Sequence, residues 1–261
     1  WVGHLPGGLA MATIGACAGF SAICGSTSAT AATIASVALP EMKKYNYDPA
    51  LATGVVAAGG SLGILIPPST IFIIYGILTE QSIGKLFLAG VLPGILLALL
   101  FIVTIFIWTW LKPELVTPAP RSTFREKLAS LAGVIETFIL FAAVMGGLFM
   151  GIFTPTEAAA VGAFGTILIA LAGRNLTWDG FVQALNETTR VSCMILVIVA
   201  GATVFGHFLA VTRIPFDVGY WVRELPLSPN MIMAVIIFIY IIMGCLMDSL
   251  AMITLTIPIF F

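Results

Sequence analysis

Charged residues are scarce in this chain of 261 residues: Asp, Glu, Lys and Arg together make up 9%, against about 25% in ordinary soluble domains. Hydrophobic residues make up 60%, and the mean hydropathy is +1.12. These values exclude a soluble globular protein. Several segments reach the roughly 20 apolar residues that cross a bilayer core. The composition therefore predicts an all-α polytopic membrane protein.

The low net charge and the few cysteines exclude or disfavour further classes of function. The net charge is −1, so the chain lacks the basic surface that nucleic acids require. The cysteines lie in apolar segments without the spacing of metal ligands, which favours small core side chains. They are Cys17, Cys24, Cys193 and Cys245. We expect no catalytic group and no cofactor. The chain starts at Trp1 and stops within the apolar run TIPIFF, so we expect an internal part of a longer protein.

Uninterrupted apolar segments predict simple membrane crossings. They cover residues 86–111, 128–150, 157–173 and 191–212. Two charged loops separate them, at 112–127 and 174–190, and the second has apolar residues at helical spacing, which indicates a short interfacial helix. We assign 86–212 to scaffold spans and a repeat linker, and 213–228 to an interfacial arm.

Two other segments, 5–41 and 229–261, predict re-entrant helical hairpins. Each is interrupted by a polar tip, Gly25–Ser28 in the first and Met247–Ser249 in the second. A proline precedes the tip serine by twenty residues in both, at Pro6 and Pro229. The arm after each tip is only about 13 residues long, too short for an upright crossing.

The basic residues predict the orientation. If 5–41 enters and leaves on one side and each later span crosses once, the loops at 42–48, 112–127 and 174–190 share that side and hold eight Lys or Arg, whereas the other side holds three. The positive-inside rule makes the first side cytoplasmic. Hairpin one then opens to the cytoplasm and hairpin two to the outside, as an inverted repeat predicts.

The stretch GSLGILIPPS, residues 60–69, interrupts a membrane helix between 48 and 78. Apolar halves at 49–59 and 70–78 flank it. Pro67 and Pro68 have no N–H to donate, and Gly60 tolerates unusual dihedral angles. One interpretation is a proline kink that serves helix packing. The other is a broken helix whose free carbonyls, with the hydroxyls of Ser61 and Ser69, bind a cation.

The hairpin tips supply further candidate ligands. Ser26, Thr27 and Ser28 offer uncharged oxygen atoms of the kind that Na⁺ prefers, although such hydroxyls also join packed membrane helices. Asp248 precedes Ser249 at the second tip, and a carboxylate within a membrane segment suggests a functional site. The alternative for Asp248 is a helix N-cap.

Three other polar features have structural interpretations. The residues from Thr154 to Glu157 have the chemistry of a helix start. Glu136 lies within its span without an obvious partner in the sequence. Gly59–Gly63 matches the G-x-S-x-G pattern of serine hydrolases, and His207 lies in another span. We disfavour an intramembrane serine hydrolase, because the nucleophile elbow needs a strand–turn–helix context.

Four stretches together resemble the large membrane subunit of TRAP (tripartite ATP-independent periplasmic) transporters. They are GSLGILIPPS, ILTEQSIGKLFLAGVLPGILLALLF, GIFTPTEAAAVGAFG and GCLMDSLAMITLTIPIFF, and they are spread over the whole chain. The resemblance implies a Na⁺-coupled elevator-type secondary transporter in the bacterial or archaeal inner membrane. It also implies organic-acid uptake, a periplasmic binding protein and a small membrane subunit.

Within this resemblance, Ser26, Thr27 and Ser28 form the first tip, and Asp248 and Ser249 the second. The broken helix contributes the remaining positions, which are Gly60, Ser61, Pro67, Pro68 and Ser69. The substrate is expected between the tips. The family's N-terminal spans and second broken helix are absent from these 261 residues. A Na⁺/dicarboxylate symporter without a binding protein and a non-transporting scaffold subunit are the alternatives.

Overall fold

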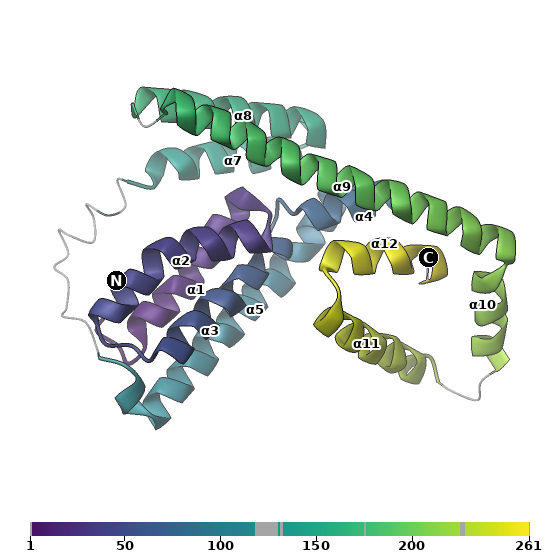
Figure 1. Ribbon diagram of the computed structural model, residues 1–261, viewed down its shortest axis with the longest axis horizontal. Helices are drawn as coiled ribbons and strands as arrows, with labels where there is room; N and C mark the ends of the chain where they lie inside the picture. Colours follow the sequence, from purple (N-terminus) through teal and green to yellow (C-terminus); the bar gives the residue numbers. More distant parts are fainter. Residues whose placement is uncertain (1, 118–129, 131–132, 175, 225–227, 261) are drawn as a thin grey trace. The chain divides into compact units, whose positions relative to one another are not determined.

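The computed structural model describes all residues except 1, 118–129, 131–132, 175, 225–227 and 261, and the described part is helical without β-strands (Figure 1). Four of its helices are long and apolar enough to cross a membrane. They are α5 (Ile83–Leu111), α8 (Pro155–Ala172), α9 (Trp178–Thr212) and α11 (Pro229–Leu246). The prediction of an all-α fold is confirmed for the described residues, with four candidate membrane spans.

The chain forms two compact units. Unit 1 comprises Trp1–Ile73 and Ser82–Asn175, and unit 2 comprises Ile74–Gln81 and Leu176–Phe261. Each is described by itself.

Hairpin one begins unit 1 with two antiparallel helices, α1 (Gly8–Cys24) and α2 (Thr27–Lys44). The chain reverses at Gly25, whose φ of 62° lies in the left-handed region that glycine adopts without strain. Its N–H donates to the carbonyl of Ser21 and ends α1. The Ser26 hydroxyl then accepts the N–H of Ala29 and starts α2. The reversal falls within the predicted tip.

The broken helix follows as α3 (Pro49–Gly60), the 3₁₀ turn η1 (Ser61–Ile64) and α4 (Thr70–Leu78). Asp48 caps α3 by accepting the N–H groups of Ala50 and Leu51. The helix is interrupted where GSLGILIPPS predicts, and the Pro67–Pro68 peptide bond in this stretch is cis.

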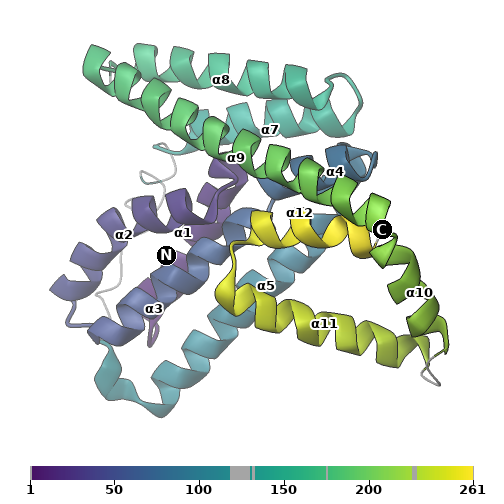
Figure 2. The same cartoon turned by 45° about the vertical axis from the view of Figure 1, so that its right-hand side comes forward.

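The core of unit 1 lies where α1, α2, α3 and α5 pack side by side (Figures 1 and 2). Ile14, Met42 and Leu62 are its largest fully buried apolar side chains. The opposite face of α5 exposes Leu92, Leu96 and other large apolar residues. A helix with one face packed on protein and a leucine-rich face exposed is what a span at the lipid boundary requires.

The open end of hairpin one is held by contacts that we call the base. The Tyr47 hydroxyl accepts the N–H of Leu9 at 3.2 Å, and this N–H lies in the first turn of α1, where it has no partner within the helix. The N–H of Asp48 donates to the carbonyl of Leu115 at 2.9 Å, in the 3₁₀ turn η2 (Pro113–Leu115) that follows α5. Burial raises the pKa of the Tyr47 phenol. The base thus joins both arms of the hairpin to the end of α5.

Two antiparallel helices, α7 (Ile135–Phe149) and α8, complete unit 1. Thr154 and Glu157 form a capping box at the start of α8, so their side chains have the helix-start role expected from the sequence. Phe87 on α5 packs with Met145 and Leu148 on α7 and Ala158 on α8. The α7–α8 pair is therefore attached to the start of α5.

In unit 2, α9 is one continuous helix of 35 residues, about 52 Å long. The sequence suggested a separate interfacial helix within 174–190, but the structure continues that segment into the span. Within this helix the Thr188 and Thr189 hydroxyls donate to carbonyls one turn back.

The rest of unit 2 begins with α10 (Ile214–Glu224), which follows Arg213 in the left-handed conformation. Phe216, Tyr220 and Trp221 are exposed on it, a composition typical of interfacial helices. Hairpin two follows as α11 and α12 (Ser249–Phe260). A 2.6 Å hydrogen bond between the hydroxyls of Tyr240 and Thr256 joins its two arms.

Candidate functional site

The hairpin-one tip lies against the interrupted segment of the broken helix. A Cβ atom at Gly25 would lie 2.6 Å from the carbonyl oxygen of Pro68, and one at Gly63 would lie 2.7 Å from the carbonyl oxygen of Ser26. Both distances are shorter than real Cβ contacts. The two backbones approach this closely because neither glycine carries a side chain. The Thr70 hydroxyl also donates to the carbonyl of Gly25 at 3.3 Å.

Gly60, at the end of α3, makes a similar approach to the start of α2. Its Cβ would lie 2.8 Å from that of Ala31 and 3.2 Å from the carbonyl oxygen of Thr27. The structure therefore brings together the tip and most of the residues predicted from the broken helix. Of the tip hydroxyl residues, Ser28 is exposed and Thr27 is half-buried.

The predicted serine hydroxyls of the broken helix donate their protons within that segment. Ser61 donates to the carbonyl of Ala58, and the fully buried Ser69 donates to that of Ile64, both at 2.6 Å. A hydroxyl that donates its proton to a carbonyl keeps lone pairs on its oxygen. Both serines can therefore serve as neutral oxygen ligands without losing these bonds.

Two hydroxyls that the sequence did not single out lie on the two arms beside the tip. Ser21 is in the last turn of α1 and Thr30 in the first turn of α2, and both residues are 0% exposed. Neither hydroxyl has a hydrogen-bond partner among the residues that the structure describes. A buried hydroxyl without a partner costs about 1–3 kcal/mol, so such a group normally binds water or an ion. Only their nearness to the tip could have indicated them in the sequence.

Helix ends of both polarities meet at this place. The C-terminal ends of α1 and α3 contribute carbonyl groups and partial negative charge, and the N-terminal ends of α2 and α4 contribute N–H groups and partial positive charge. Each end is equivalent to roughly half an elementary charge. The site can therefore attract a cation and an anion without any charged side chain of its own.

The second tip, in unit 2, has a different chemistry. Asp248 is exposed, and its carboxylate accepts the N–H of Leu250 at 3.0 Å at the start of α12. The N-cap alternative for Asp248 is thus confirmed as one role of this side chain, and its other oxygen atom is not needed for that bond. Ser249 is the first residue of α12.

The other polar candidates do not form an additional site in the described structure. Ser61 of the G-x-S-x-G pattern follows a helix rather than a strand, so the local geometry of a nucleophile elbow is absent there. His207 is exposed on α9, and Glu136 is exposed in the first turn of α7. Arg121, Arg125 and Lys127 of the predicted basic loop lie outside the described residues.

Comparison with known proteins agrees with the resemblance seen in the sequence. The family model described as "Tripartite ATP-independent periplasmic transporter, DctM component" matches residues 1–261. The C4-dicarboxylate TRAP transporter large permease protein DctM of Pseudomonas aeruginosa is 41% identical over 262 residues, which cover 100% of this chain and 61% of that protein.

Two further relatives are named for other substrates. The isethionate TRAP transporter permease protein DctMQ of Oleidesulfovibrio alaskensis is 34% identical, over 99% of this chain and 41% of its own length. The sialic acid TRAP transporter large permease protein SiaM of Vibrio cholerae is 32% identical, over 98% of this chain and 60% of its own length. This chain thus spans 41–61% of the length of these three relatives, and all three are named as transporter permeases rather than enzymes.

Proposed function

Because this chain belongs to the family of TRAP transporter large permease subunits, we propose that it forms the Na⁺-binding part of a secondary transporter that imports an organic acid. The observation that carries the proposal is the docking of an uncharged, oxygen-rich hairpin tip onto a broken membrane helix. Irregular backbone is tolerated at membrane depth where it is buried in protein or lines a cavity.

The coupling ion binds between the hairpin-one tip and the broken helix. Na⁺ is a hard cation that suits neutral oxygen ligands, and the negative ends of α1 and α3 both face this region. Backbone carbonyls and the hydroxyls of Ser26, Ser61 and Ser69 are the predicted ligands. Ser21 and Thr30 extend the set, since an ion or its water would satisfy their buried oxygen atoms.

The substrate is an organic anion that binds next to the cation. The N-terminal ends of α2 and α4 provide N–H groups for a carboxylate or similar group. A bound cation strengthens this attraction by partly cancelling the negative ends of α1 and α3, so ion and substrate promote each other's binding. The relatives named above for C4-dicarboxylates, isethionate and sialic acid fit an acidic substrate.

We extend the proposal to the rest of the transport cycle, which the resemblance to the family suggests. The two hairpins belong to inverted repeats, and the transport domain moves by an elevator mechanism in the cytoplasmic membrane. A periplasmic binding protein delivers the substrate, and a small membrane subunit completes the complex. Packing of α5 against α1 and α3 supports motion of α5 together with hairpin one.

Uptake by proteoliposomes tests the proposal. They should contain the full-length parent protein and its small subunit, with the binding protein added and with or without an inward Na⁺ gradient. Ser61→Ala removes a proposed ligand, and Ser36→Ala removes an exposed hydroxyl that bonds within α2. We expect Na⁺-dependent uptake that Ser61→Ala weakens and Ser36→Ala preserves.

Two results would count against this assignment. Uptake that depends on neither the Na⁺ gradient nor the Ser61 hydroxyl would indicate that the interrupted segment is only a kink that serves helix packing. Uptake that persists without the binding protein would instead favour the Na⁺/dicarboxylate symporter.

A further inference from the structure

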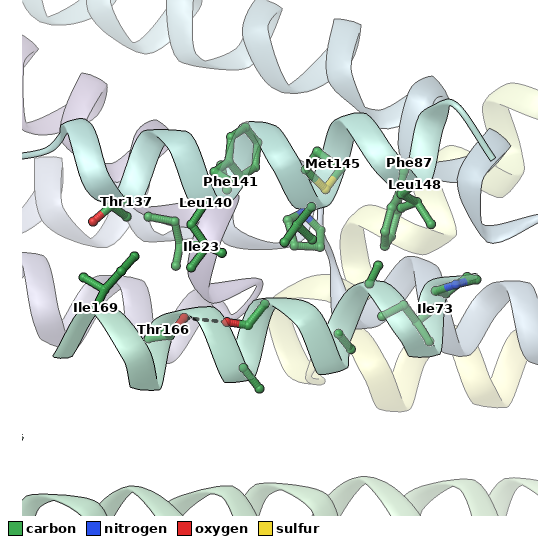
Figure 3. Close-up of a pocket in the computed structure, with 18 residues that line it drawn as sticks. Ile23, Ile73, Phe87, Thr137, Leu140, Phe141, Met145, Leu148, Thr166 and Ile169 are labelled. Atoms are coloured by element: carbon green, nitrogen blue, oxygen red, sulfur yellow. Dashed lines mark hydrogen bonds between the residues drawn. The ribbon is translucent and has the colours of Figure 1, made fainter. Parts of the chain in front are cut away.

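A long apolar cavity, which we call the slot, runs along the seam between α7 and α8 in unit 1 (Figure 3). Its volume is about 420 Å³. Thr137 and Ile169 line one end, and Phe87 and Ile73 line the other (Figure 3). Ile23, two residues before the tip glycine, also lines it. The slot thus reaches from the α7–α8 pair to the hairpin-one tip.

The small side chains of α8 create the slot. Ala158, Ala159, Gly162 and Ala163 recur at three- and four-residue spacing and line it along the helix. They belong to the stretch GIFTPTEAAAVGAFG, where the sequence interpretation explained only the helix start. On the facing side, α7 contributes a stripe that runs from Thr137 to Leu148.

The lining cannot hold water well. None of the described residues that line the slot is charged, and the Thr166 hydroxyl already donates to the carbonyl of Gly162 at 2.8 Å. A buried water needs two to four polar partners, whereas apolar cavities of about 150 Å³ stay dry and bind benzene. The slot is nearly three times that size, and unlike a sealed cavity it opens to the surface along α8, where Ala159 and Ala163 are exposed. Its chemistry therefore selects a hydrocarbon ligand.

The shape of the slot points to one ligand class. The stripe from Thr137 to Leu148 covers twelve residues of α7, and its ends are about 17 Å apart along the helix. One leaflet of a bilayer core about 30 Å thick is about 15 Å deep. A slot that follows about three turns of helix suits an extended chain better than a compact molecule. We propose that the slot binds a single acyl chain of a membrane phospholipid.

Continuity with packed structure supports a bound chain over a loose surface contact. Phe87, Met145, Leu148 and Ala158 line the slot and also form the buried cluster that joins α5 to α7 and α8. One end of the slot is therefore lined by buried core side chains. A chain that enters along the seam ends against them.

Photolabelling tests the proposal with the full-length protein and its small subunit in nanodiscs. The probe is phosphatidylethanolamine with a diazirine at the end of one acyl chain. Ala159→Leu fills the slot. Ala160→Leu adds the same side chain to the same helix at an exposed position that does not line it. Ala163→Leu is a second filling variant in case the first does not fold.

We expect labelled peptides from 137–148 in the unmodified protein and in Ala160→Leu. Either filling variant, at an unchanged melting temperature, should reduce this labelling by about tenfold or more. Equal labelling in all variants would overturn the proposal. So would labelling confined to other segments, which would mean that another part of the complex fills the slot. The labelling experiment does not measure uptake, so it tests the acyl-chain proposal independently of Na⁺ coupling.

Discussion

Replacing Gly63 by alanine should push the hairpin-one tip away from the broken helix. The new Cβ atom would lie 2.7 Å from the carbonyl oxygen of Ser26, 2.8 Å from its carbonyl carbon and 3.0 Å from the backbone nitrogen of Thr27. All three atoms belong to the backbone and cannot turn aside as a flexible side chain would. Overpacking of this kind costs about 1–3 kcal/mol, so we expect a clear fall in thermal stability.

Gly54 provides the matched control, because it lies in α3 and a Cβ atom there meets nothing within 4 Å. Alanine at this helical position should stabilise the protein by about 0.5–1 kcal/mol. The measurement is the melting temperature of each full-length variant, with and without Na⁺. Opposite shifts are expected, and Gly63→Ala should also lose much of the stabilisation by Na⁺. Similar shifts for both variants would refute the close docking of the tip.

Three further predictions concern single side chains. If Ser21 and Thr30 bind the ion or its water, Ser21→Ala and Thr30→Val should weaken Na⁺ binding in a calorimetric titration. If they bind nothing, removing these unpaired hydroxyls should stabilise the protein by about 1 kcal/mol and leave the Na⁺ affinity unchanged. The fold raises the pKa of Tyr47. Its contribution to the free energy of unfolding is therefore complete at pH values below its unfolded pKa of about 10, and it is lost as the pH rises through the folded pKa. The melting temperature should therefore drop more steeply above pH ~10 in the unmodified protein than in Tyr47→Phe, and parallel curves would contradict this. Asp248→Asn keeps a good N-cap but removes the charge, so uptake should fall at unchanged stability if the carboxylate has a role in transport; unchanged uptake would limit Asp248 to capping.

The interruptions of the helices could be predicted from sequence because their causes are local. Gly25 and the stretch from Gly60 to Pro68 contain the residues that helices tolerate least, and the structure breaks the helices there. The cap formed by Thr154 and Glu157 is another local signal. These features depend on the backbone preferences of a few neighbouring residues, so no knowledge of tertiary contacts is needed.

The features that the sequence did not reveal depend on distant contacts. Nothing local distinguishes Ser21 and Thr30 from other hydroxyls, and only the packed structure shows that they are buried without partners. The slot arises because small residues of α8 face α7, which a single helix pattern cannot show. Local polarity was also misleading over 174–190, since α9 continues through part of it without interruption.

The base of hairpin one has a mechanical consequence. Tyr47 and Asp48 clamp the open end to α1 and to the segment after α5, whereas the tip is held by close backbone packing and one hydroxyl contact. The two ends of the hairpin are thus held by different kinds of contact, and the arms between them pack along α3 and α5. Pro40 lies near the fixed end of α2 and lacks the N–H that would continue the helix ladder, which makes that arm more compliant there.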